Sequence, residues 1–131
     1  MVSANVELVR AVYARWASGD FSSTDWAHPE IEYVNPPGAI EPGTRRGLAA
    51  FSRAVESTLE GWESWQMEPE RLEAFGDQVA AVVRYRARGR GSGVEVQGRE
   101  SALWTIRDGK VVQYKWFHKP ADAFERARAA T

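Results

Sequence analysis

The chain contains no cysteine, so it forms no disulfide framework, no thiolate zinc site and no cysteine nucleophile. It also lacks an excess of either charge, because 17 basic and 18 acidic side chains leave a formal net charge of -1 at pH 7. This balance gives no general attraction to nucleic acid. No apolar run reaches membrane-spanning length, and residues 1–13 lack the basic start and apolar segment of a signal peptide. We therefore expect a cytoplasmic protein with neither a nucleic-acid nor a membrane partner.

Metal and cofactor motifs are also missing. The two histidines, His28 and His118, fall in separate predicted elements, and no carboxylate–histidine spacing is typical of a metal site. Residues 89–93 are rich in glycine but lack the following helix that a phosphate-binding loop needs. We therefore expect no metal and no cofactor.

Aromatic side chains, by contrast, are abundant. Six tryptophans occur in 131 residues, which indicates an aromatic-walled cavity or a large interface. The length suits one domain with a real core, and neither repeats nor linkers divide the chain. We predict a single domain over residues 1–131.

The clearest local signal is a hairpin around Asp108-Gly109, between two runs of strand-forming residues. A two-residue loop would place the apolar side chains of one strand on the wrong face, so a loop of three residues is predicted. This register pairs Trp104 with Val112 and puts large apolar residues of both strands on one face. The side chains of that face are Glu100, Ala102, Trp104 and Ile106 on the first strand, and Val112, Tyr114, Trp116 and His118 on the second.

Hydrophobic periodicity predicts the remaining elements. Helices are expected over residues 4–18, 20–26 and 47–60 and after Pro120, and strands over 31–35, 62–75 and 78–90. His28-Pro29 is interpreted as a turn, and residues 36–46 as a flap over a cavity. Helices on one face of a curved sheet give an α+β domain.

This order of elements, together with several short motifs, resembles the SnoaL-like branch of the nuclear-transport-factor-2-like superfamily. That branch contains polyketide cyclases and has ketosteroid isomerases as relatives. The resemblance implies a curved antiparallel or mixed sheet wrapped around helices to form a cone-shaped cavity, and a homodimer through the convex sheet face. The motifs are Ala17-Ser18-Gly19-Asp20, His28-Pro29, Asn35-Pro36, Gly91–Val96 and Leu103–Val111.

The catalytic positions of the ketosteroid isomerases are not kept. By resemblance, the isomerase base falls at Asn35, its protonated aspartate near Ala102, and its tyrosine near Val12 beside Tyr13. An amide cannot accept and return a proton at neutral pH, so isomerisation by that route is not expected. Position 102, often a histidine in this branch, is also inert here.

Two ionisable residues on the apolar face are the candidate catalysts. Loss of hydration raises the pKa of a carboxyl such as Glu100, and a partner such as His118 could share or relay its proton. Equally, Glu100 could reach water at the end of the hairpin, and His118 could be a core histidine bonded to backbone. Tyr33 and Asn35 could orient a carbonyl or enol oxygen, or simply satisfy buried backbone groups.

The aromatic residues are expected to contact a small lipophilic molecule, or else to fill the cavity completely. The predicted ligand-binding set is Tyr13, Trp16, Tyr33, Asn35, Trp65, Tyr85, Ala102, Trp104, Tyr114 and Trp116. Two functions remain open. One is a cofactor-free acid–base isomerase or cyclase acting on a carbonyl-bearing ring compound, and the other is a non-catalytic ligand-binding or dimerisation module.

Overall fold

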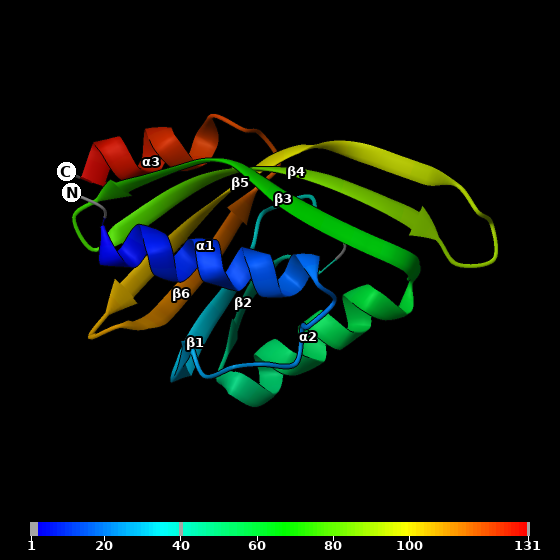
Figure 1. The fold of residues 1–131 in the computed structure, drawn as a ribbon, viewed down its shortest axis with the longest axis horizontal. Helices are drawn as coiled ribbons and strands as arrows, with labels where there is room; N and C mark the ends of the chain where they lie inside the picture. The colour runs from blue at the N-terminus through cyan, green and yellow to red at the C-terminus, as the bar shows by residue number, and fades with distance from the viewer. Residues whose placement is uncertain (1–2, 40, 131) are drawn as a thin grey trace.

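The computed structural model describes residues 3–39 and 41–130 (Figure 1). Within this part of the chain, three helices accompany one six-stranded sheet. The elements are α1 (Ala4–Ala17), β1 (Ala27–Asn35), β2 (Gly43–Arg46), α2 (Leu48–Glu60), β3 (Trp62–Phe75), β4 (Gln78–Gly89), β5 (Glu95–Arg107), β6 (Lys110–Phe117) and α3 (Asp122–Ala130).

The sheet is curved and mixed. Its strand order is β2-β1-β6-β5-β4-β3, and all neighbours are antiparallel except β1 and β6, which run parallel. In Figure 1, α1 and α2 lie together over one face of this sheet, whereas α3 lies apart from them. This architecture confirms the predicted α+β cone. We call the face toward α1 and α2 the inner face, and the opposite one the outer face.

Helix α1 brings four large side chains to the inner face. Ser3 caps it, because its hydroxyl oxygen accepts a hydrogen bond from the backbone N–H of Val6 at 3.3 Å. The helix ends at Ala17, and Gly19 follows with a φ of 91°, a conformation that favours glycine. The buried side chains recur at helical spacing: Val9, Val12, Tyr13 and Trp16. The prediction of a helix over 4–18 is confirmed to within one residue.

The predicted helix over residues 20–26 is wrong. The carboxylate of Asp20 instead accepts hydrogen bonds from the backbone N–H groups of Ser22 and Ser23, at 3.2 Å each, and so stabilises a local turn. Trp26 is buried after this turn, and its indole donates to the carbonyl of Ser23 at 2.8 Å. Strand β1 then begins at Ala27, so His28-Pro29 lies within the strand and does not form the predicted turn.

The β5–β6 hairpin exists, but its predicted register is wrong. Asp108 and Gly109 have φ values of 51° and 75°, so the loop has only these two residues and closes on Arg107 paired with Lys110. Ile106 pairs with Val111, and Thr105 pairs with Gln113. Val112 is therefore the extra residue of a β-bulge.

That bulge explains why the predicted face is nevertheless largely right. It compensates for the two-residue turn, so Trp104 pairs with Tyr114 and Ala102 with Trp116. The side chain that joins the core near the turn is that of Val111, which is completely buried, and not the predicted Val112. The large residues of both strands thus share the inner face.

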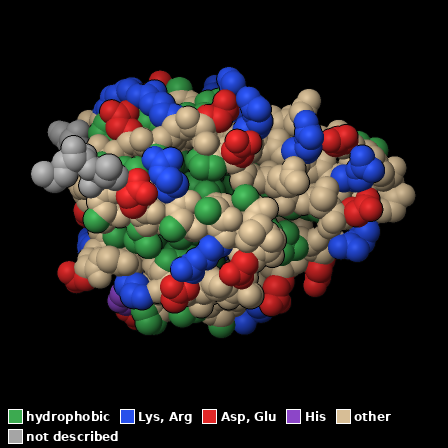
Figure 2. Space-filling view, in the orientation of Figure 1, with side chains coloured by type: hydrophobic (Ala, Val, Ile, Leu, Met, Phe, Trp, Pro, Cys, Tyr) green, Lys and Arg blue, Asp and Glu red, His purple; other side chains and the backbone are tan. Residues whose placement is uncertain are grey.

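Helix α3 covers part of the outer face. Ala123, Phe124 and Ala127 are buried, as predicted, and pack in one cluster with Ala80 and Leu103. The helix begins at Asp122, two residues after Pro120. No helix in residues 3–39 or 41–130 is long and apolar enough to cross a membrane. Figure 2 shows basic and acidic side chains interspersed over the visible surface, with no field of a single sign.

Candidate functional site

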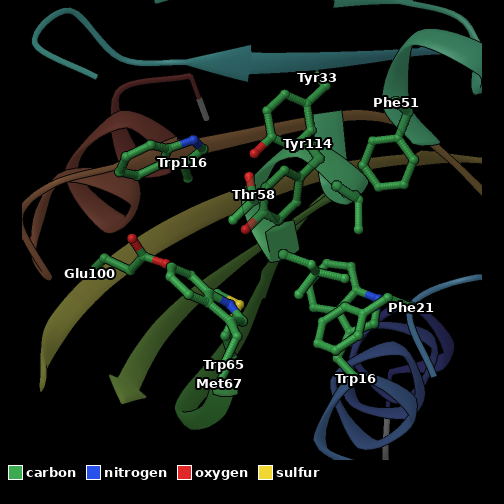
Figure 3. Close-up of a pocket in the computed structure, with 12 residues that line it drawn as sticks. Trp16, Phe21, Tyr33, Phe51, Thr58, Trp65, Met67, Glu100, Tyr114 and Trp116 are labelled. Carbon is green, nitrogen blue, oxygen red and sulfur yellow. The ribbon is translucent and has the colours of Figure 1, made fainter. Parts of the chain in front are cut away.

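A pocket opens between α2 and the inner face of the sheet (Figure 3). Its volume of about 130 Å³ is close to that of cavities which bind a single benzene ring. Its walls are mostly aromatic and aliphatic. They consist of Trp16, Phe21, Tyr33, Phe51, Val55, Thr58, Leu59, Trp65, Met67, Glu100, Tyr114 and Trp116.

Simple periodicities place these side chains. Helix α2 contributes residues 51, 55, 58 and 59, which share one helical face. The strands contribute alternate positions, such as Trp65 and Met67 on β3 and Tyr114 and Trp116 on β6. Trp16, from the end of α1, packs against Phe21 with nearly parallel rings 6.1 Å apart. These two residues form the wall beside the first helix.

Among the described residues that line the pocket, Glu100 is the only one with a carboxylate. Among the described residues, no hydrogen bond or ion pair satisfies its carboxyl group, which lies between Trp116 above and Trp65 and Met67 below in Figure 3. Burial disfavours the charged form and raises the pKa of Glu100 to about 7. Near neutral pH, this carboxyl therefore exists in both protonation states.

Two phenols line the same pocket. Burial and the nearby charge of Glu100 raise the pKa of Tyr33 to about 12. Burial, chiefly, raises the pKa of Tyr114 well above its ordinary value, with Tyr13 and Glu100 contributing in the same direction. Both phenols therefore stay protonated at neutral pH. The Tyr33 hydroxyl can donate a hydrogen bond to a ligand oxygen, whereas the Tyr114 hydroxyl is hydrogen-bonded with that of Tyr13.

Asn35 acts on the pocket wall from outside. Its Oδ1 accepts a hydrogen bond from Nε1 of Trp116 at 2.5 Å, and its Nδ2 donates to the carbonyl of Glu41 at 2.7 Å. Asn35 is thus absent from the lining but fixes the indole of Trp116. Glu41 belongs to the segment 36–46, which was predicted to be a flap. Residue 40 of this segment lies outside the described residues, and its end, Gly43–Arg46, forms β2.

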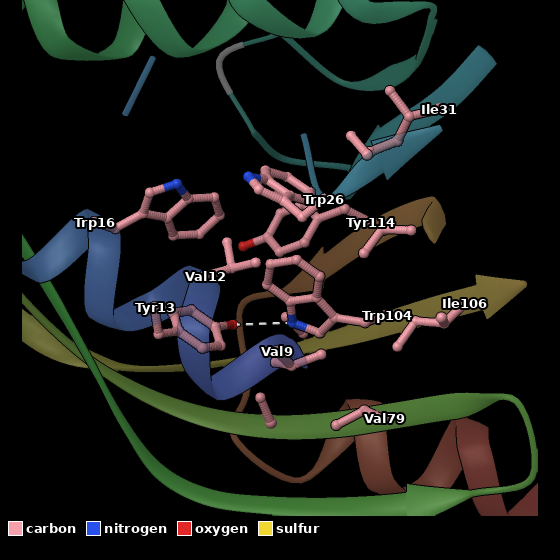
Figure 4. Close-up of a cluster of buried hydrophobic side chains, with 14 of the residues drawn as sticks. Val9, Val12, Tyr13, Trp16, Trp26, Ile31, Val79, Trp104, Ile106 and Tyr114 are labelled. Carbon is pink, nitrogen blue, oxygen red and sulfur yellow. Dashed lines mark hydrogen bonds between the residues drawn. The ribbon is translucent and has the colours of Figure 1, made fainter. Parts of the chain in front are cut away.

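Three of the predicted ligand-binding residues lie in the core beneath the pocket (Figure 4). Tyr13 and Trp104 are completely excluded from solvent, and Nε1 of Trp104 donates to the hydroxyl of Tyr13 at 3.1 Å. Ala102 is 1% exposed. Trp16 and Tyr114 pack over Trp104, with ring centroids 5.7 and 4.7 Å away, so Trp104 does not reach the cavity.

His118 and Tyr85 lie outside the pocket lining. His118 is exposed just after β6, with its ring 5.0 Å from that of Trp116. No hydrogen bond among the described residues links it to Glu100, so the proposed proton relay has no direct contact in the structure. The structure thus brings together Trp16, Tyr33, Trp65, Glu100, Tyr114 and Trp116 from the predicted set.

Sequence reasoning missed the contribution of α2 and of Phe21. The amphipathic pattern identified Phe51, Val55 and Leu59 as one helical face, but nothing local indicated that this face closes a pocket. Thr58 and Phe21 had no distinguishing signal at all. Within the part of the chain that the structure describes, no cluster of three histidines or carboxylates could hold a metal ion.

The family is decided by a sequence comparison. The model of the SnoaL-like domain matches residues 9–114, which run from within α1 to within β6 and include every pocket residue except Trp116. The chain belongs to the SnoaL-like domain family. No curated protein matches this SnoaL-like protein significantly in sequence.

Solved structures share the fold. An NTF2-like protein of unknown function from Burkholderia pseudomallei has a TM-score of 0.82 at 16% identity, covering 95% of this chain and 97% of its own. A candidate SnoaL-like polyketide cyclase from Jannaschia sp. has a TM-score of 0.77 at 20% identity, covering 98% and 93%. TerC, co-crystallised with polyporic acid, has a TM-score of 0.75 at 22% identity, covering 96% and 99%. At these identities the likeness shows the fold alone.

Proposed function

We propose that this SnoaL-like protein binds a small lipophilic ring compound bearing a carbonyl group, and that Glu100 transfers a proton on it. One observation carries the proposal. Among the described residues, Glu100 is the single carboxylate in a mostly aromatic and aliphatic pocket, with a pKa of about 7. A general base or acid works best when its pKa lies near the working pH.

The chemistry follows from the groups in the pocket. The carboxylate of Glu100 removes a proton from the carbon beside the carbonyl, and the electron pair moves onto the carbonyl oxygen. The phenol of Tyr33 is a protonated donor for this developing oxyanion. Where a C=C bond is conjugated with the enolate, Glu100, now protonated, returns the proton to the far carbon of that system, the C=C bond shifts, and the balanced result is an isomerisation. A ring closure arises instead when the enolate attacks a second carbonyl of the same molecule and the resulting alkoxide takes the proton from Glu100.

A test of the base does not require the natural substrate. The ring opening of 5-nitrobenzisoxazole needs only removal of one C–H proton as the N–O bond breaks, and it produces a coloured phenolate. We expect the protein to accelerate this reaction, with a rate that rises with pH through about 7. Glu100→Gln should lower the rate at least 100-fold, the usual contribution of a positioned base.

The matched control is Glu68→Gln, which removes an exposed carboxylate of β3. This variant should keep the full rate. Equal rates for Glu100→Gln and the natural protein would overturn the assignment of Glu100 as the base.

The second candidate is a non-catalytic ligand-binding or dimerisation module. It is favoured by Asn35 and Ala102, which stand where related isomerases carry catalytic carboxylates. If only binding matters, Glu100→Gln should leave the affinity for polyporic acid intact while no ring compound is turned over. Calorimetric titration of the two proteins distinguishes this candidate from the first.

A homodimer through the outer face stays a prediction. The outer face of β3, β4 and β5 carries paired charges: Glu70 contacts Arg99 at 2.8 Å and Arg84 at 3.5 Å. Light scattering after size exclusion tests this assembly, and a monomer at micromolar concentration would contradict it. The cytoplasmic location stays a prediction as well.

A further inference from the structure

Three half-buried aromatic rings lie next to the pocket, and the proposed chemistry does not use them as a group. Trp62 and Trp65 contact each other with ring centroids 5.7 Å apart. Trp65 and Tyr85 are 6.3 Å apart, with ring planes parallel to within 6°. We call Trp62, Trp65 and Tyr85 the aromatic platform. Trp62 and Trp65 lie at the start of β3, and Tyr85 lies on the neighbouring strand β4.

A glycine sets the position of the platform. Gly98 pairs with Tyr85 across β4 and β5. A Cβ atom at position 98 would lie 2.7 Å from the Tyr85 hydroxyl oxygen and 2.9 Å from ring atom Cζ. The Tyr85 ring therefore lies directly against the Gly98 backbone, an approach that a residue with a side chain would prevent.

The platform is continuous with the pocket. Trp65 belongs to both, since it lines the cavity and contacts both other platform rings. Glu100 lies two residues after Gly98 on the same face of β5. The carboxylate therefore lies where the pocket meets the platform.

We propose that the aromatic platform is a second subsite, which binds a flat aryl arm of the ligand outside the pocket. This inference rests on the proposed function of the pocket and names its substrate class. A cavity of about 130 Å³ accommodates one ring, so a larger ligand must extend out of it. The platform offers aromatic rings that are continuous with the pocket through Trp65, and stacked aromatic pairs add affinity beyond area burial. The ligand is thus an elongated compound of at least two linked rings, with its carbonyl-bearing ring next to Glu100.

A matched pair of probes tests the subsite. Polyporic acid is 2,5-dihydroxy-1,4-benzoquinone carrying two phenyl arms, and the unsubstituted hydroxyquinone is the same core without them. We expect calorimetric titration to show binding of both, with polyporic acid the tighter. Tyr85→Ala and Trp62→Ala should each lower the affinity for polyporic acid about tenfold, the scale of one lost aromatic contact. Both variants should leave the affinity for the unsubstituted hydroxyquinone unchanged.

Gly98→Ala gives an independent variant that keeps every aromatic side chain. Its Cβ should displace the Tyr85 ring. The affinity for polyporic acid should then fall, whereas the affinity for the unsubstituted hydroxyquinone should not. The control is Arg86→Ala, which changes the residue next to Tyr85 on the exposed, opposite face of β4. Arg86→Ala should leave both affinities unchanged.

The possible failures are distinguishable. If neither probe binds the natural protein, both the proposed function and the subsite are overturned. If both probes bind but the platform variants leave polyporic acid unaffected, only the subsite is overturned. If Tyr85→Ala or Trp62→Ala instead changes the oligomeric state seen by light scattering, the platform contacts a second copy and the subsite is likewise overturned.

Discussion

The indole of Trp116 is bonded to the side-chain oxygen of Asn35 over 2.5 Å, so an amide outside the pocket fixes one of its walls. The resemblance to ketosteroid isomerases puts their catalytic base at Asn35. Here it contacts Trp116 and the carbonyl of Glu41 instead. In this chain Asn35 therefore positions the indole of Trp116 and takes no part in proton transfer.

Replacing Asn35 tests that role. Asn35→Ala removes the acceptor of the Trp116 N–H and should lower the free energy of unfolding by about 1 kcal/mol. Asn35→Ala should also lower the affinity for the probe polyporic acid, because Trp116 loses its fixed orientation. Asn35→Asp keeps an oxygen for Trp116 but loses the donor to Glu41, so it should retain more of the affinity than Asn35→Ala. Equal affinities for the natural protein and Asn35→Ala would contradict the role.

The hydrogen bond between Trp104 and Tyr13 should matter mainly for stability. Both side chains are completely buried, so Tyr13→Phe leaves the indole N–H of Trp104 without its acceptor. A buried N–H without an acceptor lowers the free energy of unfolding by about 1–3 kcal/mol, which urea-induced unfolding can measure. The control Tyr85→Phe removes the hydroxyl of a partly exposed tyrosine, and a change of less than about 0.5 kcal/mol is expected. An equal effect of the two substitutions would count against the buried bond.

Glu100 should make stability depend on pH. Its pKa is raised in the folded protein from an ordinary 4.5 to about 7, so the folded state binds the proton more tightly than the unfolded state. Stability from this group is therefore full below pH 4.5, falls as the pH rises to about 7, and is constant above that. The whole effect is at most about 3 kcal/mol.

Comparison with Glu100→Gln isolates this contribution. The carboxyls of Asp20, Asp25 and Glu32 have lowered pKa values through hydrogen bonds to serines or arginines, and they lose stabilisation at acidic pH in both proteins. Subtracting the two unfolding curves removes their effect. Between pH 5 and pH 7, the free energy of unfolding of Glu100→Gln should increase relative to that of the natural protein. A difference that does not vary with pH would show that Glu100 reaches water in the folded protein.

Ser101 should hold helix α3 on the sheet. Its side chain is completely buried, donates to the carbonyl of Lys119 at 2.6 Å and accepts from the N–H of Ala123 at 3.1 Å. Ser101→Ala should cost about 2 kcal/mol, since two backbone groups lose their partner. Ser64→Ala, at an exposed position of β3, is the control for urea-induced unfolding. Faster amide hydrogen exchange confined to α3 would locate the effect, whereas unchanged exchange there would refute it.

The sequence was most informative where long periodic patterns act alone. The helices over 4–18 and 47–60 and the strands over 62–75 and 78–90 were predictable, because burial of one face selects one period. The segment 20–26 was not, because the hydrogen bonds that the N–H groups of Ser22 and Ser23 donate to Asp20 compete with a helix of only a few residues. The bulge at Val112 also has no local signal, since it is stabilised by the pairing of the whole hairpin.

The pocket shows a similar division. Strand alternation indicates the face to which Glu100 and Trp104 point, but it does not give their depth beneath other side chains. Trp16 and Tyr114 pack over Trp104, which keeps it in the core, while Glu100 reaches the cavity. The contribution of Thr58 depends on how α2 docks on the sheet, which is a tertiary contact that no local pattern encodes.

The bulge in β6 has a practical consequence for engineering this scaffold. Every residue from Gln113 to Phe117 owes its side to the single unpaired position before it. A regular ladder that paired Val112 with Thr105 would pair Trp116 with Ser101 and exchange inside for outside from Gln113 onward, so that Trp116 would leave the cavity. Grafts between proteins of this fold should therefore be aligned from the bulge onward, not counted from the tip of the turn.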